Sequence, residues 1–119
     1  MNLTPTSSRR QIITVVLLLL ALGMGSAASA QEPALFKNAD LKLGQRLIAE
    51  NKCAECHARK WADDGNAIYR PKGRINTPAL LQSMVERCSS ELSLNLFPEE
   101  ITAISAALNH AHYKFRDAP

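Results

Sequence analysis

Residues 53–57, Cys-Ala-Glu-Cys-His, form a C-x-x-C-H motif whose residue types and spacing suit the covalent attachment of haem. Two intervening residues allow the thiols of Cys53 and Cys56 to add to neighbouring vinyl groups of one porphyrin. His57 follows directly, so its imidazole can bind the iron from the proximal side. The motif therefore predicts one haem c per chain, attached through Cys53 and Cys56, with His57 as an axial ligand.

A bare Cys-x-x-Cys pair is also typical of a redox disulfide or of half a zinc site. Cys53 and Cys56 could be joined by His110 and His112 to give four zinc ligands. Neither alternative explains why a histidine adjoins the second cysteine. The chain holds three cysteines, an odd number, so at least one thiol does something other than pair within the chain. A zinc or thiol module therefore ranks behind haem attachment.

The first thirty residues have the pattern of an export signal. Two arginines precede an apolar run over residues 12–22, and a group of small residues ends at Ala30. The apolar run is short for a bilayer span of about 20 residues. We expect residues 1–30 to be a signal peptide that is cleaved after Ala30, which makes the protein periplasmic and limits membrane contact to the export step.

Length and charge restrict the remaining possibilities. The chain has 119 residues, 46% of them hydrophobic, which is enough for one small domain over residues 31–119. Its 14 Lys and Arg face 11 Asp and Glu, and two of the arginines lie in the export segment. A nucleic-acid-binding protein needs a clustered basic face with a much larger excess. The composition therefore excludes nucleic acid as a partner.

The first expected helix leads into the haem motif. Asp40 is a suitable N-cap, and Leu43 and Leu47 lie four residues apart, so they form an apolar stripe. Gly44 lies on the same helix and leaves room for another helix to approach. We predict that this helix delivers the chain to Cys53.

A second helix is predicted to begin at Thr77, which can cap it, with Pro78 in the first helical position. Apolar or sulfur-containing side chains then recur along one arc of the helical wheel. They are Leu80, Leu81, Met84, Val85, Cys88 and Leu92. We expect this arc to face one apolar surface, which in a haem protein is the porphyrin.

A last helix is predicted to begin at Pro98, because Glu99 and Glu100 then lie in its first turn and favour the helix dipole. Its apolar residues Ile101, Ile104 and Leu108 are most simply core. The section over residues 58–76 contains glycine and proline, so we expect it to be irregular.

Together, the stretch over residues 40–47 and the C-x-x-C-H motif resemble the class I c-type cytochromes, a family of small, exported, helical one-electron carriers. The resemblance implies an all-α fold, a cytochrome c-like bundle of three principal helices around one covalently bound haem. In the family, an aromatic residue of the last helix meets the glycine of the first. Here Ala106 and Ala107 stand at that place, and Tyr113 or Phe115 could substitute.

The sixth iron ligand is the point at which this chain departs from the family. The usual methionine precedes the last helix, and residues 93–98 contain none. Met84 and Cys88 are the remaining sulfur candidates, on one face of the second helix. A methionine would raise the reduction potential, whereas a thiolate would lower it. His110 and His112 are further candidates, but we expect both at the surface.

The irregular section carries five basic residues against two acidic ones. Arg70 and Arg74 could pair with haem propionates or with an acidic redox protein. Tyr69 could line the haem, and the carbonyl of Pro71 could accept the imidazole N–H of His57.

The resemblance implies a carrier that transfers single electrons between redox partner proteins, rather than an enzyme in its own right. No cluster of serine, histidine and acid is recognisable, so hydrolysis and group transfer have no support. The alternative is an open iron site that binds small gases, as in a sensor or an oxygen-reactive protein, because the distal region is atypical.

Overall fold

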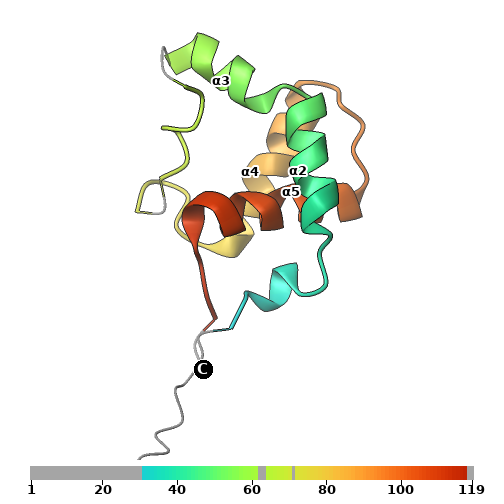
Figure 1. Cartoon of the computed structure of the whole chain (residues 1–119), viewed down its shortest axis with the longest axis vertical. Helices are drawn as coiled ribbons and strands as arrows, with labels where there is room; N and C mark the ends of the chain where they lie inside the picture. Colours follow the sequence, from blue (N-terminus) through green and yellow to red (C-terminus); the bar gives the residue numbers. More distant parts are fainter. Residues whose placement is uncertain (1–30, 62–63, 71, 118–119) are drawn as a thin grey trace, which may run out of the picture.

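The computed structural model describes residues 31–61, 64–70 and 72–117, so the expected signal peptide lies outside the described residues. These residues form a 3-10 turn, four α-helices and a final π-helical turn (Figure 1). In chain order they are η1 (Ala34–Phe36), α2 (Leu41–Glu50), α3 (Cys53–Trp61), α4 (Pro78–Glu91), α5 (Pro98–Leu108) and η2 (Asn109–Tyr113). The described part of the chain contains no strand, only one isolated bridge between Gln31 and Asp117. The predicted all-α class is confirmed.

Helix α2 begins and ends as its sequence dictates. The Asp40 carboxylate accepts a hydrogen bond from the backbone N–H of Leu43 at 2.9 Å, which confirms the predicted N-cap. At the other end, the Asn51 side chain donates to the carbonyl of Leu47 at 2.9 Å. Lys52 has a positive φ of 51° and turns the chain into α3. The end of α2 therefore fixes where the haem motif begins.

The predicted starts of α4 and α5 are also confirmed. The Thr77 hydroxyl accepts from the N–H of Leu80 at 3.2 Å, and Pro78 occupies the first turn. At the start of α5, the backbone N–H of Phe97 donates to the carboxylate of Glu100 at 2.9 Å. Both ends are determined locally, because each cap bond joins residues three apart.

Helix α5 is the centre of the fold. Every residue from 103 to 108 is buried, and α2 packs against it more extensively than any other helix does. Figure 1 shows α5 crossing α2 and leading into η2 near the C-terminal end. The main cluster of buried apolar side chains surrounds this helix: Phe36, Leu47, Leu81, Ile104, Ala106, Leu108 and Tyr113.

Helices α2 and α5 meet at a glycine. A Cβ at Gly44 would overlap the carbonyl oxygen of Ala103 and would stand 2.9 Å from the Cβ of Ala107. The prediction that Gly44 leaves room for a second helix is confirmed. The facing residues are alanines, and no aromatic atom is among the nearest neighbours of that position. Small side chains on both helices therefore allow the two backbones to approach.

The number of helices differs from the prediction. We expected three principal helices, but the C-x-x-C-H motif itself forms a fourth, α3, and the section expected to be irregular from Ala58 continues this helix to Trp61. Glu55 in the first turn and basic residues in the last turn complement the helix dipole, which favours this extension. None of the helices described is long and apolar enough to cross a membrane.

The last residues return to the start of the domain. The side-chain oxygen of buried Asn109 accepts from the N–H of Phe115 at 2.8 Å. Lys114 has a positive φ of 59°, which turns the chain after η2. The N–H of Asp117 then donates to the carbonyl of Gln31 at 3.0 Å. These bonds close the domain around α5.

Candidate haem site

Helix α3 presents three residues that can do chemistry on one side. Cys53, Cys56 and His57 stand at positions i, i+3 and i+4, which are neighbours on a helix surface. All three are half-buried, and the Nδ1 atom of His57 is itself buried. The three cysteines of the described chain are free thiols. The arrangement brings two unpaired thiols and an imidazole to one side of one helix.

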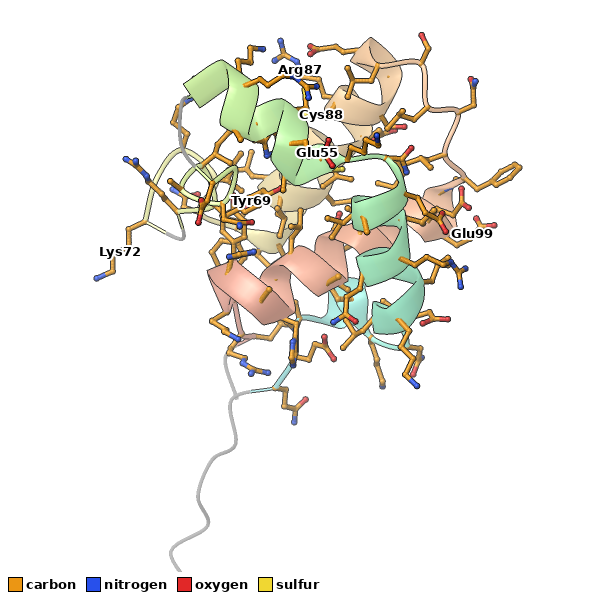
Figure 2. The ribbon with its side chains drawn as sticks, turned by 45° about the horizontal axis from the view of Figure 1, so that its top comes forward. Glu55, Tyr69, Lys72, Arg87, Cys88 and Glu99 are labelled. Atoms are coloured by element: carbon orange, nitrogen blue, oxygen red, sulfur yellow. The ribbon has the colours of Figure 1, made fainter. Side chains whose placement is uncertain are left out.

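A third thiol comes from α4. Burial raises the pKa of Cys53, and the neighbouring thiols of Cys88 and Cys56 raise it further, while a backbone hydrogen bond lowers it. The pKa of Cys88 is also raised, by burial first and by Glu91 next. Cys88 is therefore within electrostatic reach of both motif cysteines. Figure 2 places the Cys88 label where α4 faces α3, next to Glu55.

Next to the thiols, α4 leaves apolar side chains uncovered. Leu81 is 2% exposed and packs in the core, but Leu80 is 44% and Met84 36% exposed. Leu92, at the end of the helix, is 54% exposed. Only Leu81 of these four residues is therefore fully buried by the protein, and the expectation that the arc faces a porphyrin stays a prediction. Within the described residues, the protein buries one side of the arc and leaves its flank partly exposed.

Leu80, Met84 and Cys88 define this flank. Their chemistry, with that of the α3 residues, shows whether a haem would fit here. The three positions are four residues apart, so they form one row along α4. A porphyrin has broad apolar faces, and its attachment needs two thiols and an imidazole in one place. Helix α3 supplies the thiols and the imidazole, and the partly exposed Leu80 and Met84 supply apolar side chains on the row that carries Cys88. The residues present fit a covalently attached haem.

Tyr69 joins His57 to the end of the chain. The Tyr69 and His57 rings are in edge contact, with centroids 5.4 Å apart and an interplanar angle of 69°. On another side Tyr69 packs against His112, with centroids 4.7 Å apart and an angle of 32°. Burial raises the pKa of the Tyr69 phenol, and Cys53 raises it further, so the ring stays neutral. Tyr69 lies on the segment between α3 and α4 (Figure 2).

The same segment contacts α3 at a second point. Gly65 is buried with a positive φ of 81°, and a Cβ there would overlap the carbonyl oxygen of Ala54. The N–H of Asn66 donates to the Asp64 carboxylate at 2.9 Å, and the N–H of Tyr69 donates to the carbonyl of Asn66 at 3.0 Å. Two successive turns therefore bring residues 64–70 back onto the haem motif.

The other predicted site residues, on the segment before α4, have no shown contact with the α3 thiols. Arg70 is exposed and donates from Nε to the carbonyl of Ala67 at 2.9 Å, and Arg74 is exposed as well. Pro71, the predicted acceptor for the His57 imidazole, lies outside the described residues. Their expected role beside a haem therefore stays a prediction.

The two C-terminal histidines have different environments. His110 is exposed, as expected, but the expectation of a surface position is wrong for His112, which is half-buried against Tyr69. The π-helical turn η2 extends α5 and brings His112 against this ring. Burial lowers the pKa of His112, and Lys114 lowers it further. Among the described residues, no group of three or more His, Cys, Asp or Glu is arranged to hold a metal ion, so these histidines and the motif cysteines do not form the four-ligand set considered above.

Two contacts of the site were not predicted from the sequence, that of Gly65 with Ala54 and that of Tyr69 with His57. Asp64 followed by Gly65 is a turn signal that indicates where the chain reverses. Nothing local identifies the helix that the turn packs against, because that depends on the whole fold.

Comparison of the chain with known protein families, with curated proteins and with solved structures finds no match.

Proposed function

We propose that the protein is an exported monohaem c-type cytochrome that carries single electrons between redox partner proteins. The observation that carries this proposal is the side of α3 with Cys53, Cys56 and His57, within electrostatic reach of Cys88 on a row of α4 whose Leu80 and Met84 are partly exposed. A redox disulfide would account for the two thiols, but not for the adjoining imidazole or for the partly exposed apolar row.

The residues have separate roles in this proposal. Cys53 and Cys56 hold the haem through thioether bonds, and His57 binds the iron. The bound haem supplies reversible one-electron chemistry. Leu80 and Met84 cover a haem face and exclude water from it, which together with the ligands sets the reduction potential. Arg70 and Arg74 are exposed cations that could pair with the propionates or an acidic partner.

A sulfur atom of α4 is proposed as the sixth ligand. Cys88 is electrostatically coupled to both motif cysteines, so this sulfur atom of α4 lies near the residues that would attach the haem. Met84 lies one turn earlier in the same row and is 36% exposed. The coupling favours Cys88 and leaves Met84 as the alternative.

An open iron site is the second candidate function. The segment between α4 and α5, where the resembling family carries its methionine, contains none. If neither sulfur atom closes the iron, the protein binds small gases as a sensor or an oxygen-reactive protein.

The test is to express the full chain in a bacterium that attaches haem to exported proteins. We expect a red protein whose mass equals residues 31–119 plus one haem, with a sharp c-type α band when reduced and no response to carbon monoxide. A spectrum that shifts readily with carbon monoxide would support the open site. Colourless protein of unmodified mass would refute both haem functions.

Matched variants distinguish the thiols that attach the haem from the thiol of Cys88. Replacing both Cys53 and Cys56 with Ser should abolish covalent haem, while Cys88→Ser should retain it. If covalent haem survives in the double variant, the assignment of the attachment residues is wrong.

A further inference from the structure

The ring of Tyr69 contacts two imidazoles and one further aromatic ring. The centroid of the Tyr69 ring lies 5.4 Å from that of His57 and 4.7 Å from that of His112. The Tyr113 ring centroid is 6.3 Å away, at an interplanar angle of 65°. Aromatic rings in edge or offset contact favour particular mutual orientations. Three such neighbours restrict the Tyr69 ring, so His57 packs against a surface that is itself fixed.

The backbone that carries Tyr69 is fixed as well. Its N–H donates to the carbonyl of Asn66 at 3.0 Å, and the preceding turn seats Gly65 on Ala54 of α3. The segment therefore touches α3 three residues before His57 and again at His57 itself. Movement of the ring relative to α3 would require movement of both contacts.

We propose that Tyr69 is a positioning residue that holds the imidazole of His57 in one orientation for binding iron. The inference rests on the proposed function, since His57 needs a fixed ring plane only as a ligand. The plane of an imidazole that binds a metal through one nitrogen can still turn about the nitrogen–metal bond, and the edge contact with Tyr69 at 69° would oppose that rotation. Groups that contact a ligating histidine fix its orientation and tune the metal.

The contact uses the ring of Tyr69 rather than its hydroxyl. The contact is between the two rings of Tyr69 and His57, so a phenylalanine at position 69 retains the contact. A leucine retains much of the buried apolar volume but has no flat edge. The pair Tyr69→Phe and Tyr69→Leu therefore separates orientation from simple packing.

The experiment uses the full chain, matured with haem, and records the electron paramagnetic resonance spectrum of the ferric protein. The g values of a low-spin ferric haem respond to the orientation of the axial imidazole plane. We expect Tyr69→Phe to match the wild type. Tyr69→Leu should give shifted g values or a second low-spin species, with covalent haem retained.

Phe115→Leu is the matched control. Phe115 belongs to the same ring cluster, but its ring contact is with Tyr113, at a centroid distance of 5.3 Å. It should leave the g values unchanged. An equal shift in Phe115→Leu would assign the effect to general loss of packing and would overturn the inference, as would an unchanged spectrum in Tyr69→Leu.

A second variant covers the case in which Tyr69→Leu does not fold. His112→Leu removes the ring on the other side of Tyr69 and should move the g values in the same direction by less. No movement in this variant would overturn the inference. Absence of covalent haem from the wild type would instead refute the proposed function, so the two failures are distinguishable.

Discussion

Gly44 on α2 lies so close to Ala103 on α5 that a Cβ at Gly44 would overlap the Ala103 carbonyl oxygen. This approach sets the distance between the two helices that pack most extensively. Since α2 leads through Asn51 and Lys52 into α3, the same crossing determines where Cys53 begins the haem motif. The position of the candidate site therefore depends on a backbone contact that only glycine allows.

Replacing Gly44 with Ala should lower the free energy of unfolding by about 1 to 3 kcal/mol, because the added methyl group forces a closely packed helix pair apart. Urea denaturation of the purified protein measures the change. The control is Gly73→Ala on the exposed segment before α4, where a Cβ would lie 3.2 Å from the Arg70 carbonyl oxygen. There we expect a change within about 0.5 kcal/mol. Equal losses in the two variants would contradict this account.

The starts of three helices could be predicted from the sequence because their signals are local. Asp40 and Thr77 cap backbone N–H groups three residues ahead, and Pro98 is followed by two acids that favour the first turn. The all-α class follows from these starts and from apolar residues at helical spacing. The cytochrome c-like arrangement around haem stays a proposal.

The surroundings of the candidate site could not be predicted, because they depend on contacts between segments that are distant in the sequence. Tyr69 reaches His57 across twelve positions and His112 across more than forty, and no pattern in the sequence encodes either contact. His112 was expected at the surface because the apolar stripe of α5 ends at Leu108, but the π turn that follows brings it inward. Likewise, the helical spacing of residues in α4 predicts an apolar arc. It does not predict how much of that arc the rest of the protein buries.

A single substitution in the motif should leave one thioether bond. In Cys56→Ser, the haem keeps its bond to Cys53 and retains one vinyl group, which extends the conjugation of the porphyrin. The pyridine haemochrome band should therefore move to longer wavelength relative to wild type. Absorption spectroscopy of the alkaline pyridine complex measures the shift. An unshifted band in Cys56→Ser would show that Cys56 does not carry haem.

Removal of the proximal imidazole is a separate prediction. His57→Ala should lose the native low-spin spectrum, since no residue replaces the axial nitrogen. His110→Ala is the control, because this imidazole is exposed. The ferric visible spectrum distinguishes the two, and an unchanged low-spin spectrum in His57→Ala would refute the ligand assignment.

The two sulfur candidates on α4 should differ in the ferric spectrum. We expect Cys88→Ala to open the iron to carbon monoxide in the reduced state, and the wild type to lack the near-infrared band of methionine-to-iron charge transfer. Met84→Ala, four residues earlier in the same row, should leave ligation intact. The opposite pattern, with the band present and lost only in Met84→Ala, would make Met84 the ligand. A thiolate should also give a lower reduction potential than a thioether.

The stability of the protein should fall in mild acid because of His112. Burial first, and Lys114 next, lower the pKa of this imidazole below its ordinary value of 6.5, while Asp64 raises it. The unfolded chain therefore binds a proton on His112 at a higher pH than the folded protein does. Stability is unaffected by this group above its ordinary pKa, and is lost as the pH falls from there through the lowered pKa of the folded state.

Thermal unfolding of wild type and His112→Gln, at about pH 7.5 and about pH 5.5, measures this dependence. Glutamine does not titrate, so the drop in Tm between the two conditions should be smaller in His112→Gln. His110→Gln is the control, since His110 is exposed. Its drop should equal that of the wild type. If His110→Gln reduces the drop as much as His112→Gln does, burial against Tyr69 is not the cause of the acid sensitivity.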